Sequence, residues 1–234
     1  MIVREEIIGD CRMILGNSYD IIPTLCFFDC MCTDPPYEFE SSGGGIFRRD
    51  RQNMDEIQAA GLDKGFDKTI LCPMFRFNSC VVFCHNDQLP EIINYIAGNY
   101  NRFAVCAYHK TNPMPVANKH YLPDTEFYIH AWNKGGHPVG DLADKKRYYI
   151  GKNGQDKSIA HPTVKPLPLM EKIIKNINGN LIVDPFAGSG TTGIACMNLG
   201  KRFIGIEKNE KFFNIAVDRI RKHHNELQEK KKPQ

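Results

Sequence analysis

The sequence predicts an α/β fold in which a mixed, mostly parallel sheet has helices on both faces. Three observations lead to this prediction. Short apolar runs that suit buried strands are followed by acidic residues, at Asp34, Asp184 and Glu207. A glycine-rich turn opens a helix of small residues directly after one of these runs. Segments with helical spacing of apolar residues separate the runs. Because loops at the carboxyl ends of parallel strands lie at one edge of a sheet, we expect the three acids to meet there.

Length and composition are those of one globular domain. The chain has 234 residues, of which 42% are hydrophobic and 24% charged, so a single core with small inserts is expected. The net charge of +3 is too small to indicate a nucleic-acid partner by itself. Nine cysteines, without a signal peptide or zinc-type spacing, predict free thiols in a reducing cytoplasm and no metal site. No apolar run is long enough to span a membrane.

The first half of the chain begins with a short strand and a turn into a helix over residues 2–15, because Ile7 and Ile8 precede a glycine and an acid. Ile92, Ile93 and Ile96 are spaced for one face of a helix. The remaining elements predicted here are a strand over 26–32, a weak helix over 54–60, a strand over 80–84, a helix over 88–97 and a strand over 103–108.

The second half alternates in the same way. Proline opens a helix over residues 166–177, and Asn209 is a plausible cap for the last helix, over 209–227. The other elements predicted here are a strand over 127–132, an edge strand over 147–150, a strand over 181–183, a helix from Thr191 and a strand over 203–206.

The glycine-rich turn after Asp184 has the pattern of a cofactor-binding strand, turn and helix. Gly188 and Gly190 mark positions where the backbone comes close to a ligand. A P-loop would need a lysine after the last glycine, and the chain has none there. A dinucleotide fingerprint fits the glycines nominally, and a turn without any ligand is the plain alternative. Glu207, roughly twenty residues beyond the turn, can accept hydrogen bonds from ribose hydroxyls.

A second motif, Asp34-Pro35-Pro36-Tyr37, closes the strand predicted over residues 26–32. Two prolines cannot continue a strand and have no N–H, so the segment leaves the sheet with its carbonyls available as acceptors. Asp34 and a proline carbonyl can accept both hydrogens of an exocyclic amino group, while Tyr37 can stack on the ring that bears it. A proline turn after a buried strand is the structural alternative.

Together the two motifs resemble those of the DNA amino-methyltransferases, the S-adenosylmethionine-dependent family that methylates N6 of adenine or N4 of cytosine. The resemblance implies a Rossmann-like methyltransferase fold with an antiparallel strand over residues 127–132. In that family the D-P-P-Y tetrad is catalytic, which assigns the role to Asp34, Pro35, Pro36 and Tyr37. The catalytic motif precedes the cofactor turn in this chain, as it does in the β class, whose motif order is permuted.

Two shorter matches extend the resemblance. Residues 161–166, H-P-T-V-K-P, resemble the family segment that lies against the methionine part of the cofactor. Gly9-Asp10 resembles a pair whose aspartate hydrogen-bonds the cofactor adenine. The resemblance therefore assigns S-adenosylmethionine binding to Asp10, His161, Thr163, Lys165, Asp184, Phe186, Gly188, Gly190, Thr191, Thr192 and Glu207.

Two basic stretches are candidates for contact with double-stranded DNA, within small inserts near residues 38–79 and 112–160. The first follows a glycine-rich hinge beside Tyr37, and the second interleaves basic with aromatic residues. Each pattern is also typical of a solvated surface loop. With one further lysine after the strand over 103–108, the candidates are Arg48, Arg49, Arg51, Lys110, Lys145, Lys146 and Arg147.

The resemblance implies site-specific methylation of adenine N6 in a flipped-out base, as in restriction-modification enzymes of a bacterial or phage-infected cytoplasm. Aspartate at position 34 favours adenine, because the cytosine enzymes more often have serine there. Methylation of cytosine N4 and a catalytically silent nucleic-acid-binding protein remain alternatives, and Asp34 disfavours RNA or glutamine methylation, whose enzymes usually have N-P-P-Y. A homodimer is compatible with this family.

Overall fold

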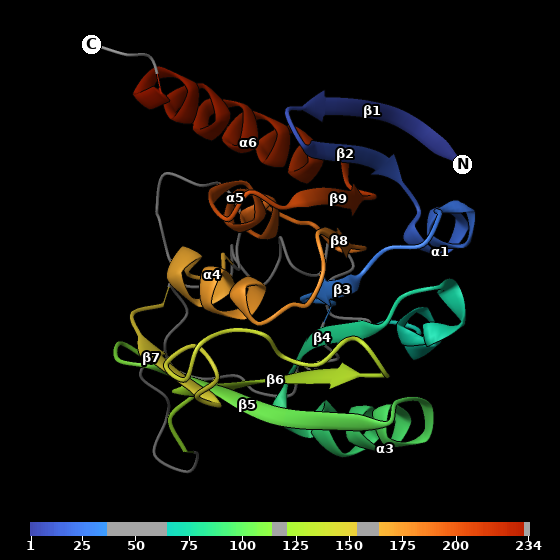
Figure 1. Ribbon diagram of the computed structural model, residues 1–234, viewed down its shortest axis with the longest axis vertical. Coiled ribbons are helices and arrows are strands. Elements are labelled where there is room, and N and C mark those ends of the chain that lie inside the picture. Colours follow the sequence, from blue (N-terminus) through green and yellow to red (C-terminus); the bar gives the residue numbers. More distant parts are fainter. Residues whose placement is uncertain (37–64, 114–120, 154–163, 232–234) are drawn as a thin grey trace, which may run out of the picture.

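The computed structural model describes residues 1–36, 65–113, 121–153 and 164–231 (Figure 1). Its strands are β1 (Ile2–Ile8), β2 (Cys11–Gly16), β3 (Cys30–Thr33), β4 (Ser79–Cys84), β5 (Arg102–Lys110), β6 (Thr125–Trp132), β7 (Tyr148–Gly151), β8 (Leu181–Asp184) and β9 (Arg202–Glu207). Its α-helices are α1 (Ser18–Ile21), α3 (Leu89–Asn99), α4 (Leu167–Lys175), α5 (Thr191–Asn198) and α6 (Glu210–Lys231), and short 3₁₀ helices include η3 (Lys68–Leu71) and η5 (Asn86–Gln88). No helix among these residues is long and apolar enough to cross a bilayer.

The described strands form one sheet in the order β1-β2-β9-β8-β3-β4-β6-β5-β7. The five strands from β2 to β4 are parallel to one another. β6 is antiparallel to both of its neighbours, and β1 is antiparallel to β2 at one edge. The mixed, mostly parallel sheet and the antiparallel strand over residues 127–132 are therefore confirmed.

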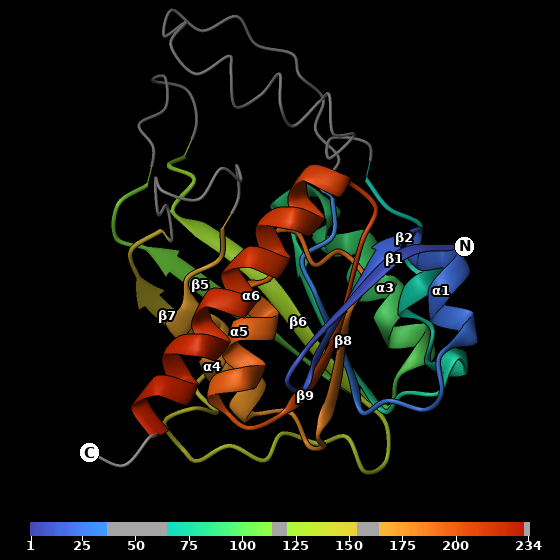
Figure 2. The same ribbon diagram turned by 90° about the horizontal axis from the view of Figure 1, so that it is seen from above.

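Helices cover both faces of the sheet, as predicted (Figure 2). α4, α5 and α6 pack on one face, where Ile173, Ile194 and Ala216 share one hydrophobic core. α1 and α3 pack on the other face, where Ile21 and Ile92 belong to a second core. Because helices cover both faces of the sheet, β4 is buried at all its residues.

The first expected element is wrong in its second half. Residues 11–16 form strand β2 rather than a helix, and β2 pairs with β9 in parallel. Gly9, with φ 55°, makes the turn that folds β1 back on β2. A short apolar run such as Cys11–Gly16 does not distinguish a buried strand from a buried helix by its pattern. This correction places the end of β2 at the carboxyl edge of the sheet.

The strand expected over residues 26–32 starts later, at Cys30. Asp29 precedes it and joins the beginning of β8 instead of continuing the ladder. Its N–H donates to the carbonyl of Leu181 at 3.0 Å, and its Oδ2 accepts the N–H groups of Asn180 and Leu181 at 2.7 and 2.8 Å. The weak helix expected over 54–60 lies outside the described residues.

Candidate functional site

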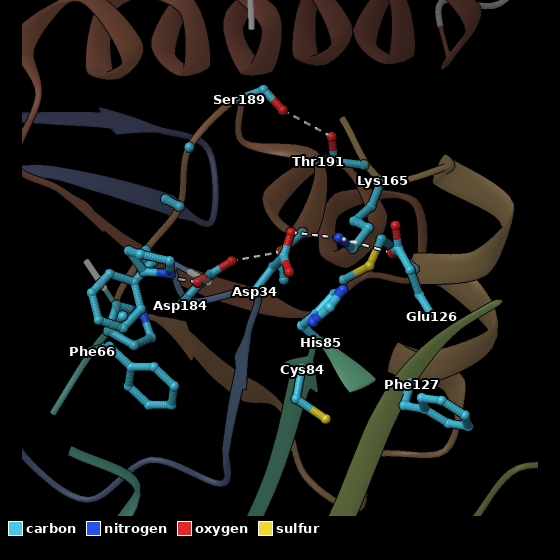
Figure 3. A pocket seen from close by; sticks show the side chains of 18 of the residues that line it. Asp34, Phe66, Cys84, His85, Glu126, Phe127, Lys165, Asp184, Ser189 and Thr191 are labelled. Atoms are coloured by element: carbon cyan, nitrogen blue, oxygen red, sulfur yellow. Dashed lines mark hydrogen bonds and ion pairs between the residues drawn. The ribbon is translucent and has the colours of Figure 1, made fainter. Parts of the chain in front are cut away.

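A cavity of about 1480 Å³ lies at the carboxyl edge of the sheet (Figure 3). Its walls come from the ends of the parallel strands, from the start of the antiparallel strand β6 and from the segment before α4. Among the residues predicted from the sequence, those that line it are Asp34, Pro36, Lys110, Lys165, Asp184, Phe186, Gly188, Thr191, Thr192 and Glu207. The expected meeting of the three acids at this edge is therefore what the structure has.

Asp184, at the end of β8, organises the turn that follows it. Its Oδ2 accepts a hydrogen bond from the Thr192 hydroxyl at 2.8 Å, and its Oδ1 accepts the N–H of Phe186 at 3.1 Å. Burial raises the pKa of Asp184 to about 7, although these two hydrogen bonds lower it. Asp184 and Thr192 thus connect the end of the strand to helix α5.

Glu207, at the end of β9, connects the same turn to the next helix. Its Oε2 accepts the N–H of Gly188 at 2.9 Å, and its Oε1 accepts the N–H of Asn209 at 2.8 Å. Burial raises the pKa of the Glu207 carboxyl, against the lowering effect of these backbone hydrogen bonds. A buried carboxylate on the cavity wall is an acceptor suited to hydroxyl groups of a ligand.

Gly190 has a packing role that the sequence did not indicate. Its φ of 77° favours glycine, and a Cβ added there would lie 3.1 Å from the Cβ of Ala216 in α6. Gly190 does not line the cavity. Of the two glycines expected to approach a ligand, only Gly188 does so by its position, while Gly190 lets the turn approach α6.

Sequence reasoning missed the wall formed after β2. Asn17 and Ser18 follow that strand and line the cavity beside the turn. The hydroxyl of Ser18 donates to the carbonyl of Pro185, which fixes α1 against the end of β8. Tyr19 and Phe66 both meet the Phe186 ring edge-on, at centroid distances of 6.3 and 6.0 Å. Had residues 11–16 been identified as a strand, Asn17, Ser18 and Tyr19 would have been placed at the cavity from the sequence.

Asp34 lies directly after β3, the strand next to β8, and forms an ion pair inside the cavity (Figure 3). Its Oδ2 is 2.6 Å from the Nζ of Lys165, whose side chain is 11% exposed. The Lys165 ammonium also lies over the Phe83 ring, 4.8 Å from its centroid. The structure therefore brings Lys165, which the resemblance assigned to the cofactor, into contact with the predicted catalytic acid.

Glu126 and Lys110 complete this group of charges, and Glu126 was not predicted. Glu126 Oε2 is 3.2 Å from Lys165, and its Oε1 is 2.6 Å from Lys110. Burial alone would raise the pKa of Glu126, but the two ammonium groups outweigh burial and lower it to about 2. Lys110, expected to contact nucleic acid, lies 13% exposed in the cavity wall with this carboxylate as its partner.

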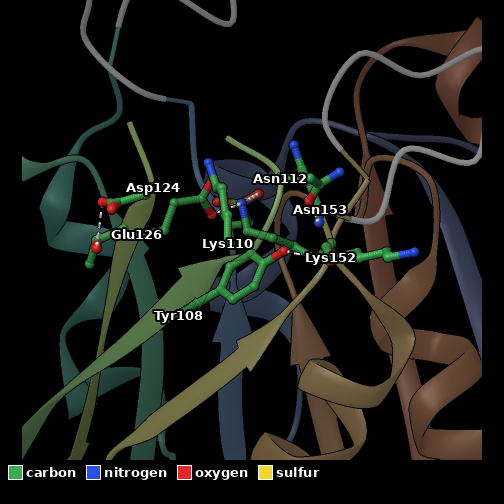
Figure 4. A network of polar contacts seen from close by, with 10 residues as sticks. Tyr108, Lys110, Asn112, Asp124, Glu126, Lys152 and Asn153 are labelled. Carbon is green, nitrogen blue, oxygen red and sulfur yellow. Dashed lines mark hydrogen bonds and ion pairs between the residues drawn. The ribbon is translucent and has the colours of Figure 1, made fainter. Parts of the chain in front are cut away.

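Two hydrogen bonds beside Lys110 join the end of β5 to the segment after β7 (Figure 4). The Tyr108 hydroxyl donates to the carbonyl of Lys152 at 2.8 Å, and Asn153 N donates to Asn112 Oδ1 at 2.6 Å. These contacts tie the end of β5 to the segment after β7. The position of Lys110 is therefore set on both sides, by the sheet and by the loop that follows β7.

Asp10 is a correction to the predicted cofactor residues. It lies in the turn between β1 and β2, and its carbonyl accepts the N–H of Phe203 near the beginning of β9. The cavity lies at the other end of β9, where Glu207 is located. Asp10 and the cavity are therefore at opposite edges of the sheet, because β2 is a strand and not the expected helix.

The second basic stretch is also displaced from the cavity. Lys145, Lys146 and Arg147 precede β7, which pairs in parallel with the middle and end of β5. The Nζ of Lys172 in α4 donates to the carbonyl of Lys146 at 2.5 Å and anchors this segment beside the second half of the helix. None of the three basic residues lines the cavity, and their contact with nucleic acid stays a prediction.

The remaining predicted residues lie outside the described part of the chain. They are Tyr37, Arg48, Arg49, Arg51, His161 and Thr163. Pro35 is described and continues the segment that leaves β3, and Pro36 lines the cavity. Within the described residues, no cluster of histidine, cysteine and acidic side chains could hold a metal ion.

Comparison with known proteins gives one family. A family model for DNA methylases matches residues 28–218. The Type II methyltransferase M.HinfI of Haemophilus influenzae is 40% identical over 91% of this chain and 67% of its own length. The Type II methyltransferase M2.DpnII of Streptococcus pneumoniae is 42% identical over 84 residues, which is 35% of this chain and 28% of that protein. The aligned part of this chain thus spans less than a third of some relatives.

Solved structures agree with the fold. The M1.HpyAVI–SAM complex covers 90% of this chain and 99% of its own, with a TM-score of 0.64 and 28% sequence identity. The cytosine-N4-specific PvuII DNA methyltransferase covers 97% of this chain and 96% of its own, with a TM-score of 0.65. At 14% identity, the second similarity concerns the fold alone.

Proposed function

The chain belongs to the DNA methylase family, and from this premise we propose that it transfers a methyl group from S-adenosylmethionine to N6 of adenine in double-stranded DNA. One observation supports the proposal most directly. Asp34 and Glu207 line the same cavity from β3 and β9, the two strands that flank β8. An acceptor for an amino group and an acceptor for ribose hydroxyls are thus on opposite sides of one turn.

The donor end of the cavity fits an adenosyl group. Glu207 is 8% exposed and would accept hydrogen bonds from the ribose hydroxyls. Phe186 and Phe66 offer apolar ring surface for the adenine, beside the polar side chain of Asn17. Bound S-adenosylmethionine supplies an electrophilic methyl group on a sulfonium centre. Asp184 and Thr192 act indirectly, because their mutual hydrogen bond holds the turn in shape.

The acceptor end fits an exocyclic amino group. Asp34 would accept an N–H hydrogen bond and orient the nitrogen lone pair toward the methyl group, about 3 Å away and in line. The amine is not protonated at neutral pH, so no strong base has to act before the attack. A base inside a duplex cannot reach Asp34 in this cavity, and the target base is therefore expected to leave the helix. This requirement connects the enclosed site to a DNA substrate.

Adenine is favoured over cytosine by the residue type at position 34, through the family pattern in which adenine enzymes have aspartate. The cavity volume of about 1480 Å³ is also large enough for a purine beside the donor. Arg48, Arg49 and Arg51 are the proposed phosphate contacts, since they follow Tyr37 in the sequence.

The test is incubation of the purified protein with labelled S-adenosylmethionine and unmethylated genomic DNA, followed by mass spectrometry of the nucleosides. The expected product is N6-methyladenine. Label found only in N4-methylcytosine would overturn the choice of base and leave the reaction class intact. Cofactor binding without any label in DNA would contradict DNA methylation and favour the silent scaffold.

A further inference from the structure

Four charged side chains alternate in sign across the acceptor end of the cavity, in the order Lys110, Glu126, Lys165, Asp34 (Figures 3 and 4). Successive partners are 2.6, 3.2 and 2.6 Å apart. Their side chains are 13%, 21%, 11% and 24% exposed in that order. Because these side chains are largely buried, each charge depends on its neighbours more strongly than it would at the surface.

Glu126 reaches this array from the antiparallel strand. β6 runs against β4 and β5, so the beginning of β6 lies where its neighbours end. Both oxygens of Glu126 face lysines, and the low pKa of its carboxyl keeps it ionised throughout the neutral range. Glu126 is therefore a constant negative charge, and it is not arranged to receive a proton from a substrate.

Lys165 is the shared member of the array. Its contact with Asp34 is shorter than its contact with Glu126, by 2.6 against 3.2 Å. Lys110 is the partner of the other oxygen of Glu126. These ion pairs hold the Lys165 ammonium between Glu126 and Asp34, and the Lys165 contact is one of those that orient Asp34. Other titratable groups on the neighbouring elements include Cys84, His85, Tyr108, His109, Asp124 and Asp184.

We propose that Glu126 is a positioning residue for methyl transfer, holding the Lys165 ammonium between two carboxylates so that Asp34 stays an oriented acceptor for the target amine. The inference rests on the proposed function and adds to it a residue that does not touch the reacting atoms. In the reaction the methyl–sulfur bond breaks and a carbon–nitrogen bond forms. The nitrogen then loses one proton to the Asp34 carboxylate and from there to water, while Lys165 keeps its own protons.

The test compares Glu126→Gln and Lys110→Gln by the single-turnover rate of methyl transfer at saturating DNA and cofactor, as a function of pH. Each variant should lower the rate at neutral pH by on the order of 10- to 100-fold, because Asp34 loses its orientation. The pH at which the rate falls on the alkaline side of the profile, the alkaline limb, should shift in opposite directions in the two variants. Loss of the Glu126 charge makes the Lys165 ammonium easier to deprotonate and moves the limb to lower pH, whereas loss of the Lys110 charge moves it to higher pH.

Controls separate this from a structural effect. Glu126→Asp keeps the charge and should keep the wild-type position of the alkaline limb, even where the rate is lower. Glu5→Gln removes an ion-paired carboxylate on β1, outside the site, and should leave the rate and the limb unchanged. Cofactor affinity by calorimetry should be within about 3-fold of wild type in every variant.

Two outcomes would overturn the proposal. One is a wild-type rate and pH profile in Glu126→Gln. The other is an alkaline limb that stays in place in Lys110→Gln, a result that decides the matter even if Glu126→Gln does not fold. An inactive wild-type protein would instead refute the proposed function, so the two failures are distinguishable.

Discussion

The two ends of the cavity hold their acids by different means. At the donor end, the oxygens of Asp184 and Glu207 accept hydrogen bonds from backbone N–H groups and one hydroxyl. At the acceptor end, Asp34 and Glu126 are held by lysine ammonium groups. Burial raises the pKa of Asp184 to about 7, whereas the lysines bring that of Glu126 down to about 2 despite its burial.

This difference predicts how each end of the cavity responds to a substitution. Backbone donors are part of the fold and do not move when one side chain is changed. Ion pairs between long side chains depend on each partner, so one substitution redistributes the others. We therefore expect the donor end to respond to mutation through binding and stability, and the acceptor end through rate and through stability at low pH.

The largest expected effect is on pH-dependent stability at the donor end. The pKa of Asp184 rises from 3.8 to about 7 on folding, so its carboxyl favours the folded state below pH 4 and that contribution is lost as the pH rises to 7. The loss is about 4 kcal/mol. In Asp184→Asn the free energy of unfolding, measured by denaturant titration from pH 4 to 8, should fall less steeply.

Asp218→Asn, at an exposed position in α6, should keep the wild-type slope. An unchanged slope in Asp184→Asn as well would show that Asp184 is ionised normally in the folded protein. In that case the contrast in pKa between the two ends would disappear.

The next effect is on the rate at the acceptor end. Asp34→Ala should lower the single-turnover rate by on the order of 10²- to 10³-fold, because the target amine loses its acceptor. Its affinity for S-adenosylmethionine should stay near that of wild type in calorimetry. Asp34→Asn retains one carbonyl acceptor and should keep more of the rate. An Asp34→Ala protein that methylates DNA normally would remove the catalytic assignment.

Glu126 should show a pH dependence of stability opposite to that of Asp184. Its pKa falls from 4.5 to about 2 on folding, so its stabilising contribution is present above pH 4.5 and is lost as the pH falls through 2. The contribution is about 3 kcal/mol. Glu126→Gln should therefore lose less stability than wild type between pH 4.5 and 2.5, measured by thermal unfolding. A parallel loss in both proteins would argue against strong ion pairing.

A smaller effect is expected on cofactor binding. Glu207→Ala should weaken the affinity for S-adenosylmethionine by about 1 to 3 kcal/mol, because the ribose loses a charged acceptor and Gly188 loses its hydrogen-bond partner. Isothermal titration calorimetry measures the change. Glu210→Ala, three residues further on and exposed, is the matched control and should bind normally. Equal affinities in the two variants would refute the ribose role.

The smallest effect concerns DNA. Replacing Arg48, Arg49 and Arg51 together by alanine should flatten the dependence of DNA affinity on salt. For each phosphate that loses its arginine partner, DNA binding releases roughly one counterion fewer. Neither end of the cavity should respond, so cofactor affinity is the internal control. Identical log-log salt slopes for wild type and variant would exclude this loop as a phosphate-binding segment.

The sequence was sufficient to predict the acids at the ends of the parallel strands. Asp34, Asp184 and Glu207 each follow an apolar run, and parallel topology brings such residues to one edge. This rule did not predict Glu126, because Glu126 lies at the beginning of a strand. The edge of the sheet at which it lies is known only once β6 is placed antiparallel between β4 and β5.

Other differences have a local cause. Because a helix was expected before Leu15, Asn17 was not predicted at the cavity. The resemblance assigned Asp10 to the cofactor, but the turn that contains Asp10 lies at the opposite edge of the sheet. Lys145 and Lys146 share a basic, aromatic-rich pattern with Lys152, but β7 separates them, because Lys152 follows the strand and the other two precede it. A pattern along the chain does not tell on which side of a strand its members lie.

The pairing of β3 with β8 has a consequence for biosynthesis. Asp29 contacts Asn180 and Leu181, about 150 positions further along the chain, so the two halves of the site meet only through a very long loop closure. On the ribosome, Asp34 precedes β8, one of the two strands that pair with β3, and stays without it until residues 181–184 emerge from the exit tunnel. Glu207 follows later still. A nascent chain therefore has no donor pocket to fill until synthesis has passed β9, and cofactor binding by ribosome-bound chains of increasing length would time the assembly of the site.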